Sequence, residues 1–217
     1  MGLAIIRYSP VVNPRPLALL LALWLGLPCA ALAVASTGAL PSPALVPART
    51  YDLLVATQAC FALFVWPVFV AASTEGLRAH AARLAILVAL AAPLALACRS
   101  ISQAPVGAVA ASQFLLLLWL AGAAAARELT RDAGLWPLRA YVALAALAAA
   151  GLPLGGYLAA ELHGAESAFP FLASPLYAIV NPLETVRDVP LWVAHASGFA
   201  AVLAALVVPA RLLCRRP

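Results

Sequence analysis

Polar residues divide this chain into six long apolar stretches. The stretches cover residues 17–36, 52–72, 82–98, 106–126, 140–160 and 190–210. Each is long enough, or nearly so, to cross the hydrocarbon core of a bilayer, which is about 30 Å thick and takes about 20 helical residues. The pattern therefore predicts an all-α polytopic membrane protein, in which residues 1–217 form a single transmembrane domain with six transmembrane helices.

The longest connection between two stretches, residues 161–189, is itself apolar. Residues such as Phe171 are interspersed there with Pro170, Pro175 and Pro182, and the acidic residues stand near its two ends. Such a segment is expected to lie on the membrane surface or to re-enter the outer leaflet as one or two short helices. An ordinary outer loop that caps the helices is the alternative.

Composition and charge support this class and predict an orientation. Of the 217 residues, 65% are hydrophobic and 10% are charged, and the mean hydropathy of +1.01 lies far outside the range of soluble domains. All 13 basic residues are arginine, and ten lie at one set of ends of the stretches, whereas Arg49, Arg99 and Arg187 lie at the other. Basic loops stay in the cytoplasm, so we expect both termini there, with residues 1–16 as an interfacial lead-in.

The same charges indicate the location and exclude one partner. We expect a multi-pass protein of the bacterial cytoplasmic (inner) membrane. The formal net charge of +5 is spread over separate cytoplasmic segments, and topology together with anionic lipid headgroups accounts for it. We therefore expect the lipid membrane, and no nucleic acid, as a partner.

The first stretch has a second interpretation as a cleavable secretory signal. Arg7 and Arg15 precede an apolar run that ends in small residues near Ala35, and cleavage there would leave five spans. The run is longer than the roughly 7–15 apolar residues of a signal, so we expect a retained span.

Prolines and glycines within the stretches predict bends and close contacts. Pro67, Pro93 and Pro153 each remove a helical hydrogen bond, and the freed carbonyl must find another partner in the membrane. Kinks are therefore expected in the second, third and fifth spans. The helix-packing residues Gly151, Gly155 and Gly156 predict a face on the fifth span that another helix approaches closely, either within the bundle or in a homodimer.

Polar side chains inside the spans are few. Carboxylates stand at span edges rather than at their centres, which argues against transport coupled to protons or sodium ions. Gln58, Ser112 and Gln113 lie at depth, and we expect them to form hydrogen bonds between helices.

Two chemical hypotheses rest on histidine. Haem between helices needs two histidines at matched depths, which His80, His163 and His195 do not supply. The run from Ala194 to Gly198 is similar to the last core helix of the rhomboid intramembrane proteases. Their Gly-x-Ser-Gly motif is missing around Ser112, where an unactivated serine is a poor nucleophile. We expect no enzyme activity, catalytic residue, cofactor or metal, and keep a divergent rhomboid-like protease as an alternative.

The overall layout and three short runs carry a family resemblance. The runs are Asn13-Pro14 in the lead-in, Ser73 to Arg78 after Pro67, and Ser174 to Tyr177 in the apolar connection. In these features the chain resembles the permease subunits of ABC-2 type ATP-driven exporters. The resemblance implies a membrane-spanning permease-like subunit that exports a substrate, with re-entrant helices between spans five and six.

The resemblance also implies partners. It identifies Glu75, Gly76, Leu77 and Arg78 as a tight, solvated turn that docks a cytoplasmic ATPase subunit. The chain has no phosphate-binding Gly-x-x-x-x-Gly-Lys loop, so the ATPase must be separate. The permease is expected to form a homodimer, or a heterodimer with a similar permease. A non-catalytic integral membrane subunit of another complex, respiratory or assembly, remains the main alternative.

Overall fold

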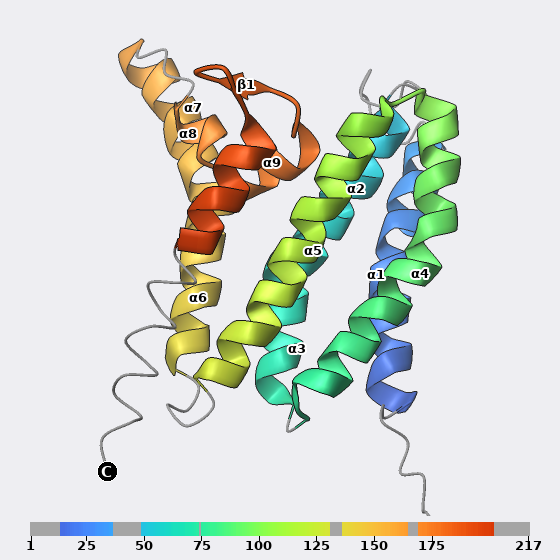
Figure 1. Cartoon of the computed structure of the whole chain (residues 1–217). Coiled ribbons are helices and arrows are strands. Elements are labelled where there is room, and N and C mark those ends of the chain that lie inside the picture. The colour runs from blue at the N-terminus through green and yellow to red at the C-terminus, as the bar shows by residue number, and fades with distance from the viewer. Residues whose placement is uncertain (1–13, 37–48, 74, 131–135, 165–168, 202–217) are drawn as a thin grey trace, which may run out of the picture.

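The apolar stretches form long helices that pack side by side (Figure 1). The computed structural model describes residues 14–36, 49–73, 75–130, 136–164 and 169–201. Its long helical elements are α1 (Pro14–Ser36), α2 (Thr50–Cys60), α3 (Trp66–Ala72), α4 (Leu77–Ser102), α5 (Val106–Leu129), α6 (Trp136–Ala146) and α7 (Leu152–His163). The π-helical turn η3 (Phe61–Val65) joins α2 to α3, and η5 (Leu147–Gly151) joins α6 to α7.

Five of these helices are long and apolar enough to cross a membrane. They begin at Leu17, Thr50, Leu77, Val106 and Arg139. The all-α prediction is confirmed, as is the length of five of the six predicted spans. The last stretch is helical from Leu191 to Ala201, and the rest of it lies outside the described residues, so a sixth span stays a prediction. The lead-in up to Asn13 also lies outside them.

One end of the bundle is rich in arginine. There α1, α4 and α6 begin and α3 and α5 end, and Arg78, Arg83, Arg127 and Arg139 lie at these helix termini. We call it the basic end; it is at the bottom of Figure 1. Arg99, in the last turn of α4, lies at the opposite end.

The third span begins earlier than the hydropathy pattern predicts. The sequence places residues 73–81 in a turn, but α4 already begins at Leu77, after Gly76 in an extended conformation. The prediction that Arg78 and His80 lie in a turn is therefore wrong. At this helix end the Arg78 side chain reaches water, whereas His80 is buried.

The apolar connection contains the two short helices that the sequence predicts. They are α8 (Phe169–Leu172) and α9 (Pro175–Val180). A two-stranded antiparallel hairpin, β1 (Thr185–Val186) with β2 (Val189–Pro190), follows and was not predicted. Arg187 and Asp188 form its tip with φ angles of 52° and 66°. This left-handed conformation usually needs Gly or Asn, so the sequence carried no hairpin signal.

The core lies between α1, α2, α4, α5 and α9. Tryptophans tie neighbouring helices together inside it: the Trp24 Nε1–H donates to the Leu87 carbonyl at 2.9 Å, and the Trp66 Nε1–H donates to the Leu120 carbonyl at 2.7 Å. Both indoles are fully buried. Because Trp24 belongs to α1, the first helix is an integral part of this core.

Candidate functional site

The connection from α8 to α9, residues 172–174, contacts the middle of the fifth span and is called the tip below. Ser174 is fully buried, and its hydroxyl donates to the Ala149 carbonyl at 3.1 Å. Ala149 is near the centre of the span from Arg139 to Leu162. This segment therefore packs against the middle of a helix that is long and apolar enough to span a membrane.

Pro153 explains why this carbonyl is available. In an α-helix, Ala149 would receive the N–H of residue 153, which proline lacks. The helix widens to the π turn η5, where the Leu152 N–H bonds the Leu147 carbonyl, and Ser174 supplies the missing donor to Ala149. The turn η3, just before Pro67, has the same form, and the kinks expected at these prolines stay predictions. Pro93, in contrast, lies inside an uninterrupted α4.

The last helix holds the other side of the tip. The His195 ring lies 2.7 Å from the Leu172 carbonyl through Nε2, and since a carbonyl only accepts, Nε2 carries the proton. Leu172 ends α8, so this bond satisfies a carbonyl left over at a helix terminus. His195 thus has a structural partner, and Ser112 has different ones on α2 and α5. No hydrogen bond between Ser112 and His195 occurs in the described part of the chain.

A double-mutant cycle tests the bond at the tip. Ser174→Ala is expected to lower the free energy of unfolding by about 1–2 kcal/mol, because it leaves the buried Ala149 carbonyl without this donor. In a Pro153→Ala background, the restored N–H of residue 153 can take over, so the same change should cost less than about 0.5 kcal/mol. Unfolding in detergent, followed by circular dichroism, measures both. Equal costs in the two backgrounds would contradict this role of Ser174.

The turn at the basic end is held by a buried arginine. Arg83 is fully buried, donates from Nη2 to Oε1 of Glu75 at 2.6 Å, and pairs through Nη1 with Oε2. Its guanidinium lies 5.2 Å from the centre of the Phe69 ring on α3. The pair therefore links the start of α4 to the connection Ser73–Gly76 and to the end of α3.

The four predicted docking residues do not share one environment. Gly76, Leu77 and Arg78 are exposed, with Leu77 exposed by 47%. Glu75 is only part-exposed and pairs with Arg83. The expectation of a wholly solvated turn is thus wrong for Glu75, because a buried guanidinium in the next helix needs a counter-charge. The hydropathy pattern did not mark Arg83 as buried, and the Glu75 to Arg83 spacing of eight residues is no helical pairing.

Polar groups at depth connect α2 with α5. The Gln113 side-chain amide donates to Gln58 Oε1 and to the Tyr51 hydroxyl, both at 3.3 Å. The Tyr51 and Ser112 hydroxyls are 2.7 Å apart. The predicted hydrogen bonds of Gln58, Ser112 and Gln113 between helices are confirmed, and Tyr51 is a member that the sequence did not single out.

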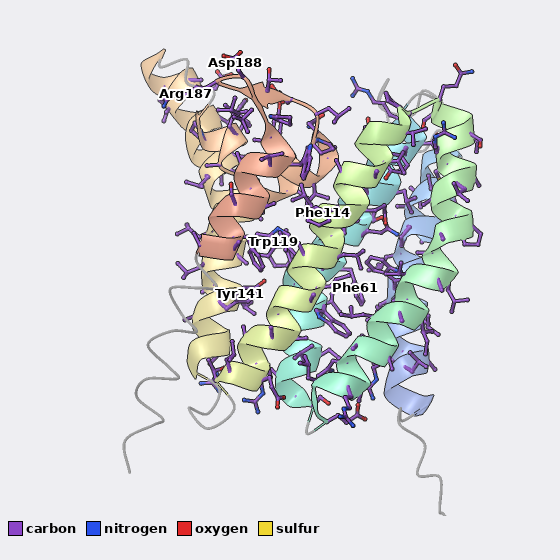
Figure 2. The ribbon with its side chains drawn as sticks, viewed as in Figure 1. Phe61, Phe114, Trp119, Tyr141, Arg187 and Asp188 are labelled. Atoms are coloured by element: carbon purple, nitrogen blue, oxygen red, sulfur yellow. The ribbon has the colours of Figure 1, made fainter. Side chains whose placement is uncertain are left out.

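A large cavity lies beside this bundle, between α5, α6 and the last helix. Its volume is about 720 Å³. Trp119 forms part of the wall and contacts Tyr141 and Phe199, with ring centroids 6.1 and 5.0 Å away. Figure 2 shows Trp119 and Tyr141 in the space between α5 and α6. The tip residues Leu172 and Ala173 also line the cavity.

Only one of the three predicted glycines lets another helix approach closely, and a closer contact lies at a glycine that was not predicted. A Cβ on Gly156 would lie 2.8 Å from the Pro170 side chain, so Gly156 lets α7 approach α8. Gly151 faces Leu147 of its own helix, and Gly155 has open space around it. Among the described glycines, the tightest contact is at Gly122, which was not predicted: a Cβ there would lie 2.1 Å from the Phe199 ring. No spacing rule marks Gly122, because its partner is remote in sequence.

Comparisons with protein-family models, with curated proteins and with solved structures found no match to this chain.

Proposed function

We propose that this protein is the membrane-spanning, permease-like subunit of an ABC-2 type exporter, energised by a separate ATPase subunit. The re-entrant tip carries the proposal: two short helices between the fifth span and the last helix reach the middle of the fifth span through Ser174 and Ala149. Such a tip is the arrangement that the family resemblance implies. In a permease it would close one end of a path between two subunits.

The orientation follows from the arginines. On this proposal the basic end faces the cytoplasm and α8, α9 and the hairpin face outward, in the inner membrane of a bacterium. The exposed turn at Gly76 to Arg78 then lies where a soluble ATPase can reach it.

Cysteine labelling tests the orientation. In a variant without the native cysteines, an impermeant maleimide added to intact cells is expected to label Ser100→Cys and Glu184→Cys, both exposed away from the basic end, but not Arg78→Cys. All three should react after the cells are opened. Labelling of Arg78→Cys in intact cells would reverse the proposed orientation.

The Arg83 guanidinium, paired with Glu75 and lying beside Phe69, is called the Arg83 clamp below. It suggests how movement of a partner would be transmitted to the helices. A partner that grips Leu77 and Arg78 holds the first turn of α4, and the Glu75–Arg83 pair with Phe69 links that turn to α3. Movement of the partner during ATP hydrolysis would thus move α3 and α4 together. The docking surface in this proposal consists of Gly76, Leu77 and Arg78, with Glu75 as its internal support.

Copurification tests the docking surface. The tagged protein, solubilised in mild detergent, is expected to bring with it a protein that contains a phosphate-binding loop and hydrolyses ATP. Leu77→Ser with Arg78→Glu should reduce the copurified ATPase at least tenfold, because it removes the apolar contact and reverses the charge. The matched control is Arg139→Glu, an equal charge reversal at an exposed residue of the same end.

The controls decide between the functions. Loss of the ATPase with Arg139→Glu, and not with the changes at Leu77 and Arg78, would move the interface to α6. A cytochrome in place of an ATPase would assign the protein to a redox complex and overturn the exporter. Labelling of Ser112 by a fluorophosphonate would revive the protease alternative.

A further inference from the structure

The cavity between α5, α6 and the last helix has the properties of a lipid-binding site. Its volume of about 720 Å³ is within the range of roughly 300–1,000 Å³ found for small-molecule sites. Trp119, Ala126 and Thr130 follow one wall along α5. The eleven residue steps from Trp119 to Thr130 correspond to about 16 Å of helix, which is close to half of a hydrocarbon core of about 30 Å.

The wall of the cavity is almost entirely apolar. None of the described residues that line the cavity is charged. The Thr130 hydroxyl is occupied by the Ala126 carbonyl at 2.7 Å, and His195 Nε2 is occupied by Leu172. The Tyr141 hydroxyl is buried and has no hydrogen-bond partner among the described residues. The wall thus presents aliphatic and aromatic groups to a ligand, and these match a hydrocarbon chain.

Exposed residues line the open side of the cavity. Leu144 is 65% exposed, and Ala194 and Gly198 on the facing helix are also exposed; all three line the cavity. In a helix that crosses a membrane, such side chains meet lipid tails. The cavity ends near Ala140 and Thr130, at the basic end, where Arg127 and Arg139 favour an anionic headgroup.

We propose that this cavity binds one acyl chain of an anionic glycerophospholipid from the leaflet at the basic end. The acyl chain enters sideways past Leu144 and lies against Trp119, and the lipid headgroup stays outside the cavity. Binding depends on no ATPase, so it is a property of this chain alone.

Quenching of tryptophan fluorescence tests the proposal. The full-length protein in detergent is titrated with phosphatidylglycerol carrying dibrominated acyl chains, because bromine quenches an indole that it touches. The difference between the parent protein and Trp119→Phe reports Trp119 alone. This difference is expected to saturate with added lipid. A difference that stays at zero, or that rises without saturation, would overturn the proposal.

A matched pair of variants localises the binding. Ala148→Phe fills the cavity and is expected to weaken saturation at least tenfold. Ala150→Phe, on the same π turn but exposed and outside the lining, should change it less than twofold. Equal effects of both variants would overturn the assignment. If Ala148→Phe does not fold, the saturation of the Trp119 signal in the parent protein still decides.

A second probe distinguishes whether the bound acyl chain comes from a phospholipid or from a single-chain amphiphile. Dibromostearic acid is a single-chain amphiphile with the same hydrocarbon. If it saturates the Trp119 signal and phosphatidylglycerol does not, the occupant is not a bilayer lipid and the proposal fails. ATPase copurification, measured also with Ala148→Phe, keeps the two proposals separate. If the protein binds lipid but no ATPase copurifies with it, only the exporter proposal is overturned. If an ATPase copurifies but no lipid binds, only the lipid site is overturned.

Discussion

Replacing Glu75 with alanine is expected to lower the free energy of unfolding by about 3 kcal/mol. The reason is that Arg83 is fully buried and Glu75 is the carboxylate that pairs with it. Without Glu75, the guanidinium beside Phe69 loses the carboxylate that is paired with it. An unpaired buried charge costs far more than a surface ion pair contributes.

The cost should largely disappear when both charges are removed. Glu75→Ala with Arg83→Met leaves no uncompensated charge, and the methionine keeps apolar contact with Phe69, so the double variant is expected within about 1 kcal/mol of the parent. Arg78→Ala, at an exposed arginine in the first turn of α4, should change stability by at most about 0.5 kcal/mol. Titration with dodecyl sulfate in mixed micelles measures all three. A Glu75→Ala value as small as that of Arg78→Ala would show that the pair does not support the turn.

Replacing Trp66 with alanine is expected to lower the free energy of unfolding by about 3–5 kcal/mol. Its indole is fully buried where α3 meets α5, stacks on Phe69 at 5.8 Å and meets the edge of His80 at 6.1 Å. Removing it opens a cavity next to the Arg83 clamp. It also removes the donor to the Leu120 carbonyl.

Trp66→Phe separates these two effects. The ring is retained and the N–H is lost, so the expected cost is about 1–2 kcal/mol. The control is Trp192→Phe, at a part-buried indole that contacts the edge of Phe114, where about 1 kcal/mol or less is expected. If Trp66→Ala cost no more than Trp192→Phe, Trp66 would not organise the basic end. Both measurements use the same unfolding assay.

Much of the fold follows from local features of the sequence. Runs of about 20 apolar residues must be helical in a membrane, because the α-helix is the conformation in which a single segment forms all of its backbone hydrogen bonds internally. Five such helices were predicted within a few residues of their observed ends. The two short helices after the fifth span also followed from composition, since Pro170 and Pro175 break an apolar segment that cannot stay in water.

The candidate sites were less accessible from the sequence. It predicted a solvated turn from Glu75 to Arg78, in which Leu77 and Arg78 are indeed exposed, but not the pairing of Glu75 with Arg83. It drew attention to Pro153, but not to Ser174 as the donor that its missing N–H requires. The cavity and the Gly122–Phe199 contact were not foreseen at all.

The amino-acid sequence by itself determined the all-α class, the positions of the long helices and the contrast between a basic end and its opposite. Hydropathy and charge decide these, because each depends on residues next to one another in the chain. Only the tertiary structure decided which helices meet, that the α8–α9 tip reaches the middle of the fifth span, and where the packing leaves a cavity. Those features depend on side chains tens of residues apart, such as Ala149 with Ser174 and Gly122 with Phe199, whose contacts no local spacing encodes.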